Sequence, residues 1–300
     1  MSKILVLGSL STDFVATTDI RPDVGETVQG NSFFTTFGGK GSNQAVAASR
    51  LESKVVMLGK VGDDSFANSI VDNLSDNGVD VSCVESVTHT SSGAAVITIS
   101  DSDNSIVYVP GANGCVDAEY VNKYKKEILS CDIAVAQHEV SEEAVEALAN
   151  ICEEGEIPFV LNPAPYRKVK ESILEKATYL LPNESECKLL YPNLSIEEAV
   201  AKYPNKLLVT MGSQGVFFND GEKSHLVPTF KVDAVDTTGA GDTFIGGFST
   251  AISNGLSIED SITLANLAAS QSVTKMGAQG GMPKLEDLKN NKNYKSSWNL

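Results

Sequence analysis

Residues 132–161 read DIAVAQHEVSEEAVEALANICEEGEIPFVL, and their pattern predicts one complete strand–helix–strand unit. The short apolar runs Asp132–Ala136 and Ile157–Leu161 each predict a buried strand. Between them, Ser141–Glu153 predicts a helix with a capped start, because the serine is followed by acidic side chains. A strand, a helix and a second strand in this order are typical of parallel strands joined by a crossover helix.

The alternation continues on both sides of this unit. Further strands are predicted at residues 3–7, 54–59, 178–181, 206–210, 216–219 and 222–227. Further helices are predicted at residues 41–51, 65–77, 117–129, 184–190, 196–202, 240–254 and 258–275. Alternating strands and helices predict an α/β fold, with a doubly wound, mostly parallel sheet covered by helices on both faces, as in Rossmann-like folds.

Two strand-rich inserts do not fit this alternation. Residues 14–37 are rich in Phe, Thr and Val, and residues 94–110 hold two β-branched runs around the polar turn Asp101-Ser102-Asp103-Asn104, which predicts a hairpin. We expect the inserts to form a small separate sheet beside the strand ends, where the ligand crevice of open α/β sheets lies. The chain is therefore predicted to be one α/β domain, residues 1–300, with these strands as a lid.

Charge and composition exclude several classes of function. The chain has 23 Lys and Arg against 39 Asp and Glu, a formal net charge of −16. A field of this sign repels phosphate backbones and anionic lipid, so neither nucleic acid nor a membrane is expected as a partner. The N-terminal apolar run Ile4–Leu7 is too short for a membrane span or an export signal.

The cysteines and histidines give no sign of disulfides or zinc. The five cysteines are scattered without a CxxC pair, and the three histidines lie far apart. With no export signal, this pattern predicts reduced thiols in a cytoplasmic chain.

Residues 236–244, DTTGAGDTF, are the first candidate for a functional loop. They precede an apolar helix, and a helix N-terminus offers free N–H groups and partial positive charge. Gly239 and Gly241 carry no Cβ that would keep an anion away from those groups. Asp242 is placed where a carboxylate could accept a proton from an attacking hydroxyl. The alternative is a tight turn with Asp242 as a helix cap.

Residues 37–44, FGGKGSNQ, are the second candidate. Backbone exposed by glycine, beside an ammonium and an amide group, suits a polyhydroxyl ligand, although a capped helix with a surface Lys40 is an alternative. The spacing is not that of a Walker A loop, and no G-x-G-x-x-G follows the first strand, which argues against a nicotinamide enzyme.

Together these two loops resemble the two signatures of the ribokinase-like (pfkB) carbohydrate kinases. Other matching motifs occur in the same order, at residues 8–13, 25–28, 111–113, 162–165, 183–186 and 210–215. The resemblance extends from Lys3 to about Pro283, and residues 37–47 are most similar to the members that act on ribose.

This resemblance implies ATP-dependent phosphorylation of the primary 5-hydroxyl of D-ribose, giving ribose 5-phosphate and ADP. A kinase for another small alcohol (deoxyribose, fructose or a nucleoside) and a catalytically silent sugar or nucleotide sensor remain alternatives. The resemblance also implies Mg²⁺ with the nucleotide, activation by a monovalent cation such as K⁺, and a homodimer formed through the lid strands.

Site residues are implied by the same resemblance. Asp242 would be the catalytic base, and the amides of Gly239, Ala240 and Gly241 would form an anion hole. The sugar would contact Ser11, Thr12, Asp13, Gly39, Lys40, Gly41, Ser42, Asn43, Glu139 and Asp242. The nucleotide would contact Asn183, Glu186, Thr210, Met211, Gly212, Ser213, Gln214, Gly215, Gly241 and Asn266. The cation would be held by Asp236, Thr238, Ser272, Lys275, Gly277 and Gly281.

The pattern departs from the family at two of these positions. Ser11 stands where these kinases usually carry Asn, so one sugar contact is expected to be weaker or replaced by water. Gly281 stands where a Ser often appears at the cation site, so only a carbonyl ligand is expected there.

Overall fold

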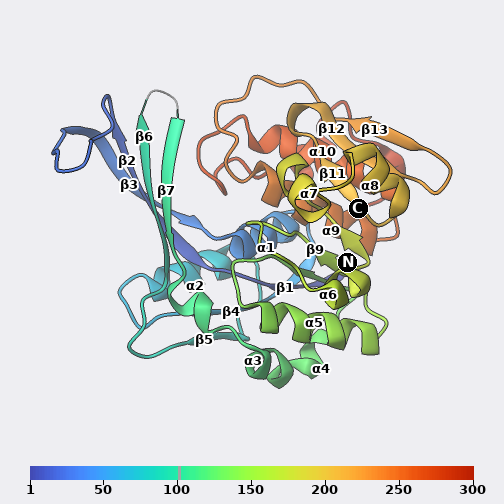
Figure 1. Ribbon diagram of the computed structural model, residues 1–300, viewed down its shortest axis with the longest axis horizontal. Helices are drawn as coiled ribbons and strands as arrows, with labels where there is room; N and C mark the ends of the chain where they lie inside the picture. Colours follow the sequence, from blue (N-terminus) through green and yellow to red (C-terminus); the bar gives the residue numbers. More distant parts are fainter. Residues whose placement is uncertain (101–102) are drawn as a thin grey trace.

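A six-stranded parallel sheet forms the centre of the molecule (Figure 1). The structure is a computed structural model that describes residues 1–100 and 103–300. The strand order is β10-β9-β8-β1-β4-β5, and each adjacent pair is parallel. The bounds are β1 Lys3–Leu7, β4 Lys54–Val61, β5 Val84–Ser86, β8 Ile133–Ala136, β9 Phe159–Leu161 and β10 Tyr179–Leu180. Because the chain order runs outward in both directions from β1, the ligand crevice is expected at the carboxyl end of β1.

Helices cover both faces of this sheet, because the side chains of each strand alternate between two cores. Leu5 and Leu7 of β1 belong to one core, and Ile4 and Val6 to the other. The first core is covered by α3 Ala118–Lys123, α4 Lys125–Ile128, α5 Glu142–Glu154, α6 Glu171–Lys176, α7 Glu184–Leu190 and α8 Ile196–Lys202. The second is covered by α1 Lys40–Arg50, α2 Ala67–Asp76, α9 Ala240–Ser253 and α10 Ile258–Ser272. The predicted fold class is confirmed.

A second, antiparallel sheet extends the structure beyond β10. It consists of β11 Leu208–Thr210, β12 Gly215–Asn219 and β13 Ser224–Pro228. Isolated parallel bridges, Leu180 to Leu207 and Asn183 to Thr210, join it to the edge of the central sheet. Residues 183 and 210, both expected at the nucleotide site, are therefore neighbours.

The two inserts form a third sheet, which projects from the body of the molecule at the upper left of Figure 1. Its strands are β2 Ser11–Thr18, β3 Gly30–Gly38, β6 Gly93–Ser100 and β7 Asp103–Val109, in the order β3-β2-β6-β7. We call these four strands the lid sheet. Asp103 and Asn104, predicted in a turn, pair instead within β7; Asp101 and Ser102 lie outside the described residues.

Several elements differ from the sequence-based prediction. The predicted helix 117–129 is broken at Tyr124, whose hydroxyl donates to Glu85 of β5 at 3.0 Å. The predicted helix 258–275 ends at Ser272, because the carbonyl of Val273 accepts the N–H groups of residues 235 and 236. The short elements β5, α6 and α11 (Leu285–Lys289) were not predicted, because three to six residues carry too little periodicity. The 3₁₀ turns are Gly111–Cys115, Gly212–Gln214 and Ser296–Trp298.

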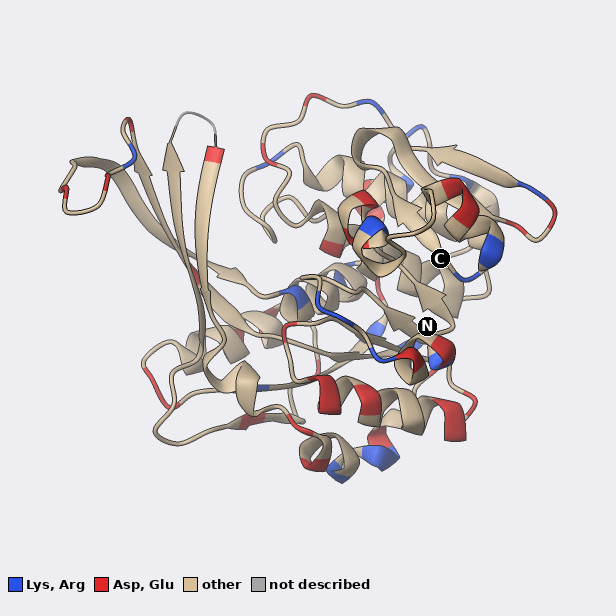
Figure 2. Ribbon diagram, viewed as in Figure 1, with Lys and Arg blue, Asp and Glu red and all other residues tan. Residues whose placement is uncertain are grey.

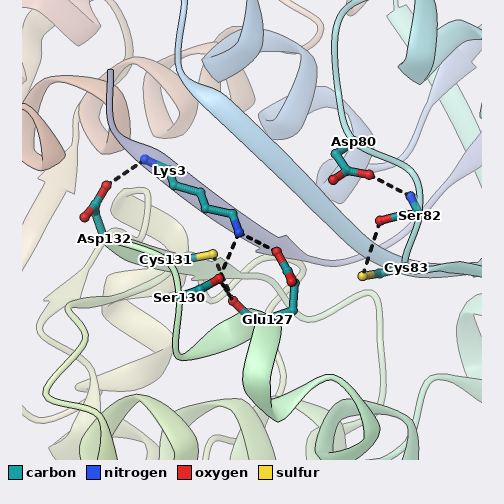
Figure 3. Close-up of polar contacts among 8 residues, drawn as sticks. All are labelled: Lys3, Asp80, Ser82, Cys83, Glu127, Ser130, Cys131 and Asp132. Atoms are coloured by element: carbon teal, nitrogen blue, oxygen red, sulfur yellow. Dashed lines mark hydrogen bonds and ion pairs between the residues drawn. The ribbon is translucent and has the colours of Figure 1, made fainter.

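Polar contacts attach the start of β1 to the chain that enters β8 (Figure 3). The backbone N–H of Lys3 donates to the Asp132 carboxylate at 2.7 Å, and its ammonium donates to Glu127 and to Ser130 Oγ. Cys131 lies beside this group, and burial raises the pKa of its thiol to about 11. A thiol that stays protonated is a poor nucleophile, so this cluster has a structural role.

Acidic residues occur in many elements of the fold and are frequent along α5 (Figure 2). Within residues 1–100 and 103–300, no helix has both the length and the apolar character that crossing a membrane requires.

Candidate active site

Two adjoining cavities lie at the start of α9: the larger is also lined by residues of the β11–β13 sheet and α10, and the smaller by Lys40 at the start of α1 and by the chain that follows β9 and β10. The larger has a volume of about 1000 Å³ and the smaller about 80 Å³. Asn183, Thr210 and Gly241 line both cavities, so together they form one continuous site. The large cavity has the size of a typical small-molecule site, and Asp242 lines the small one.

The two glycine loops meet at Asp242. This residue lies in the first turn of α9 and is 7% exposed. Its Oδ2 accepts from Asn43 Nδ2 and its Oδ1 from Gln44 Nε2, each at 3.0 Å. Both donors belong to the first turns of α1, so the carboxylate joins segments almost 200 residues apart.

The turn before α9 supplies the expected anion-binding backbone only in part. Gly239 has φ +76°, and a Cβ there would lie 2.6 Å from the carbonyl oxygen of Ala278, so only glycine fits. The Ala240 N–H already donates to the Thr237 carbonyl at 3.2 Å. The space around Gly241 is open, with no atom within 4 Å of where a Cβ would stand. An anion would therefore approach on the side of Gly241.

The side of the site beneath the lid sheet is lined with carboxylates. Asp13 is 8% exposed, and its Oδ1 accepts from Ser11 Oγ at 3.3 Å. Burial, against the opposing hydrogen bond from Ser11 and helped by the nearby charges of Glu139 and Asp242, raises the pKa of Asp13 to about 6. Glu139 accepts from Ser9 Oγ, and from the Lys40 backbone N–H at 2.9 Å.

Lys40 provides the positive charge among these acids. Its side chain is half-buried and lines the small cavity beside Asp242. The negative charge of Asp242, followed by those of Glu139 and Glu186, raises the pKa of Lys40 and outweighs the effect of its burial. The ammonium therefore stays charged in a site that holds developing negative charge.

Other residues expected at the sugar make contacts within the chain. Thr12 alternates with Ser11 and Asp13 in β2, so its side chain points to the other face of the lid sheet. The Ser42 hydroxyl donates to the carbonyls of residues 38 and 39, so it supports the start of α1. A Cβ at Gly39 would lie 2.8 Å from the Ser9 carbonyl oxygen, and one at Gly41 would lie 2.6 Å from the Ser9 nitrogen. These glycines let α1 pack closely against the chain that follows β1.

Most of the residues expected at the nucleotide line the large cavity. They are Asn183, Thr210, Gly212, Ser213, Gly215, Gly241 and Asn266. Met211 and Gln214 do not: the former packs against a hydrophobic core and the latter is exposed. Asn183 and Glu186 cap α7 reciprocally at 2.8 and 2.9 Å. Burial raises the pKa of Glu186, against the opposing effects of the Asn183 N–H and of Lys40.

The structure brings most of the expected cation residues together. Asp236 accepts from the N–H groups of Thr238 at 2.9 Å and Gly277 at 2.8 Å. Burial acts to raise the pKa of Asp236, but these hydrogen bonds outweigh it and lower the pKa. Gly281 packs so closely on Ser272 that a Cβ would lie 1.8 Å from its carbonyl oxygen. The serine that the family often carries at position 281 therefore does not fit this backbone.

The Asp236 carboxylate, with the backbone carbonyls expected at the other positions, would offer the oxygen ligands that a hard monovalent cation prefers. Lys275 was expected to contribute its backbone carbonyl, and its side chain is exposed in the turn after α10. Among residues 1–100 and 103–300, no cluster of three or more His, Cys, Asp or Glu side chains could hold a metal ion. Any cation here would depend mainly on backbone oxygens.

Sequence reasoning did not assign four buried amides and one serine near Asp242. They are Ser9, Gln44, Gln137, Asn162 and Gln279. Gln44 and Asn162 lie inside motifs that had been singled out, and Gln137 directly follows β8, at the end of the sheet where ligands bind. Gln279 carried no signal beyond its position between Gly277 and Gly281.

Comparison with known proteins defines the class. The chain matches the pfkB family of carbohydrate kinases over residues 1–285 and belongs to this family. It is therefore a carbohydrate kinase, and the predicted family membership is confirmed.

Individual relatives narrow this class. The chain is 50% identical to a ribokinase of Bacillus subtilis over 94% of its own length and 97% of the relative. It is 38% identical to a deoxyribokinase of Salmonella typhimurium, with 95% and 97% covered. The solved structure of Arabidopsis thaliana ribokinase complexed with ribose and ATP matches with a TM-score of 0.88 at 30% identity, covering 95% of this chain and 96% of that one.

Proposed function

We propose that this protein transfers the terminal phosphoryl group of ATP to the primary 5-hydroxyl of D-ribose, giving ribose 5-phosphate and ADP. The observation that carries the proposal is the position of Asp242. Its buried carboxylate lies between the acids beneath the lid sheet and the cavity at the start of α9. For transfer of a phosphoryl group from the nucleotide to the sugar, the base must lie between the two bound ligands, beside the attacking hydroxyl. The relatives named ribokinase support ribose as the sugar.

The proposed reaction follows from these positions. Asp13 and Glu139 accept hydrogen bonds from sugar hydroxyls, since one carboxylate can accept from two neighbouring hydroxyls. Asp242 takes the proton as the hydroxyl oxygen bonds to phosphorus and the bond to the ADP oxygen breaks. Lys40 and the backbone around Gly241 stabilise the charge on the phosphoryl oxygens.

The nucleotide occupies the large cavity in this proposal. Thr210, Ser213 and Asn266 line it and would contact the nucleotide, while Asn183 and Glu186 lie near the transferred phosphate. Mg²⁺ bound to the phosphates would neutralise part of their charge, and it commonly keeps most of its waters. A site with a single half-buried carboxylate, Glu186, is compatible with an ion that keeps most of its water ligands.

We also propose that K⁺ binds between Asp236 and the 272–281 loop. This loop supports Gly239, so a cation there would stabilise the turn before α9. The kcat should rise with K⁺ at constant Mg²⁺, and Asp236→Asn should abolish the response. A flat K⁺ response in the unmodified enzyme would remove this part of the proposal.

Deoxyribose is the second candidate substrate. Ser11 has a shorter side chain than the Asn usual in the family and lacks its amide donor, and the Salmonella deoxyribokinase is a close relative. Coupled ADP-release assays with ribose, deoxyribose, fructose and nucleosides would distinguish the substrates. Ribose should have the highest kcat/KM, and a higher value for deoxyribose would favour the second candidate.

Asp242→Asn tests the catalytic role directly. The kcat should fall by about 10²–10⁴-fold, because a general base is lost. Ribose binding, measured by calorimetry, should persist, because the amide keeps the shape of the site. Asp72→Asn on the exposed face of α2 is a matched control. Turnover retained in Asp242→Asn would refute the assignment; sugar binding without turnover in the unmodified protein would indicate a sensor.

We propose that the lid sheet closes over the sugar and pairs with a second copy of the chain. Its strands expose Phe33, Val96, Ile106 and Val107, each at least half exposed, and burying them on a copy would remove apolar surface from water. Ile106→Glu should convert a dimer to a monomer in light scattering. A monomer before the substitution would refute this proposal.

We propose that the protein is located in the cytoplasm, and its cysteines are compatible with this proposal. All five are free, and four of them are buried.

A further inference from the structure

Asp242 is held at the centre of a chain of buried amide side chains. Two of the amides touch its carboxylate and two more contact those amides from behind. The members are Asn43 and Gln44 of α1, Gln137 after β8, and Gln279 in the loop after α10.

The first branch runs through Gln44. Gln137 Nε2 donates to Gln44 Oε1 at 2.6 Å, and Gln44 Nε2 donates to Asp242 Oδ1 at 3.0 Å. The same Nε2 also donates to Asn162 Oδ1 at 3.2 Å. Every contact in this branch is buried, so water does not compete for these groups.

The second branch runs through Asn43. Gln279 Nε2 donates to Asn43 Oδ1 at 3.0 Å, and Asn43 Nδ2 donates to Asp242 Oδ2 at 3.0 Å. Gln279 is itself oriented, because its Oε1 accepts from Asn73 Nδ2 at 2.9 Å. Both branches therefore direct N–H groups toward the carboxylate.

We propose that Gln137 and Gln279 are positioning residues for phosphoryl transfer, which fix the amides of Gln44 and Asn43 so that both direct their N–H groups at Asp242. A carboxamide has a donor end and an acceptor end of nearly equal shape. Rotated by half a turn, either amide would place its oxygen against the carboxylate. The outer glutamines prevent this rotation because they donate to the amide oxygens.

Gln137 carries the strongest argument for a role beyond stability. It is fully buried, and its Oε1 has no hydrogen-bond partner within residues 1–100 and 103–300. Burying an unpartnered carbonyl costs free energy, so a residue selected for stability alone would be apolar here. Its one side-chain hydrogen bond is the one that it donates to Gln44. Gly8 makes room for this arrangement, since a Cβ there would lie 2.1 Å from Gln137 Oε1.

The amides act among charged groups that must be considered in any pH experiment. The ionisable groups near Asp242 are Lys40, Asp13, Glu139 and Glu186. Because Asn43 and Gln44 both donate to the Asp242 carboxylate, turning either amide would replace an attractive contact with a repulsive one.

The test replaces Gln137 and Gln279 separately by Met, which keeps the volume but cannot donate. We expect kcat to fall about tenfold in each variant, with the KM for ATP within twofold of the unmodified enzyme. Gln137→Met should keep or raise the melting temperature while kcat falls, which a purely structural residue would not do. Gln271→Met on α10 is the matched control, since its side chain lies outside the amide chain.

Gln137→Glu provides a second measurement with a nearly unchanged shape. The introduced carboxyl donates to Gln44 only when protonated, so the kcat of this variant relative to the unmodified enzyme should rise as the pH falls from 8 to 5.5. A kcat within twofold of the unmodified enzyme in both Met variants, or a relative kcat of Gln137→Glu that does not change with pH, would overturn the inference.

This inference rests on the proposed role of Asp242, and the two can fail separately. Loss of turnover in Asp242→Asn with unchanged Met variants would refute only the positioning role. Full turnover in Asp242→Asn would refute both.

Discussion

Asp13→Asn should stabilise the unliganded protein, although it removes a carboxylate proposed to bind the sugar. Burial raises the pKa of Asp13 from its usual 3.8 to about 6. The folded protein therefore holds this proton more tightly than the unfolded chain does. Asp13 favours folding fully only below about pH 3.8, and this contribution is lost as the pH rises through 6.

The magnitude follows from the two pKa values. At 1.36 kcal/mol per pH unit, the shift to about 6 makes ionised Asp13 cost about 3 kcal/mol above pH 7. Asn resembles the neutral carboxyl group, so Asp13→Asn should gain up to about 3 kcal/mol at pH 7.5. The gain should shrink by about 0.8 kcal/mol at pH 5.5, where part of the wild-type carboxyl is protonated.

Urea unfolding at pH 7.5 and 5.5 would measure this difference, with Trp298 as the fluorescent probe because it is the one tryptophan and is buried. Comparing the variant with the unmodified protein cancels the titration of His138, whose buried side chain has a pKa lowered to about 4. Ribose binding should weaken at least tenfold, because a buried polar contact is lost.

An Asp13→Asn protein that is less stable at pH 7.5, or whose stability difference does not change between pH 7.5 and 5.5, would refute this reasoning. Either result would mean that an effect other than burial determines how Asp13 contributes to the stability of the fold.

Three further substitutions test separate parts of the structure. Tyr120→Phe should cost about 1–3 kcal/mol in urea unfolding, since the hydroxyl accepts from the buried Gly59 N–H at 2.7 Å; an unchanged midpoint would contradict this. Gly281→Ala should lower stability by about 2 kcal/mol or more and weaken the K⁺ response, because its Cβ would lie 1.8 Å from the Ser272 carbonyl oxygen; normal stability with a normal response would show that the loop relaxes freely. His138→Asn should reduce the loss of stability between pH 7 and 5.5 by about 1 kcal/mol. Burial lowers the pKa of His138 to about 4, so the folded state loses stability as the pH falls below 6.5. An identical pH dependence of stability in both proteins would refute this prediction.

The sequence was sufficient to predict the sheet and the two loops because each has a strong local pattern. The apolar runs of β1, β8 and β9 are continuous and bounded by turn residues, as buried parallel strands require. The glycines at 39 and 239 were singled out locally, and both have positive φ in the structure.

Contacts between distant segments could not be predicted in the same way. Gln137 and Gln279 approach the residues around Asp242 only through tertiary packing, and their positions after β8 and between Gly277 and Gly281 do not reveal these contacts. The interruption of the helix at Tyr124 likewise carries no local signal; the hydroxyl of this residue contacts Glu85 of another strand. The Ala240 amide, expected to be free, is held by a turn that sequence periodicity does not reveal.

The two halves of the site come from opposite ends of the chain. In the proposed site, residues 9–43 supply most of the groups around the sugar, and residues 236–281 supply the base and the loop behind it. A ribosome therefore completes residues 9–43 long before it adds Asp242. On this proposal, a nascent or truncated chain that stops before Asp242 lacks the group that activates the hydroxyl and has no kinase activity.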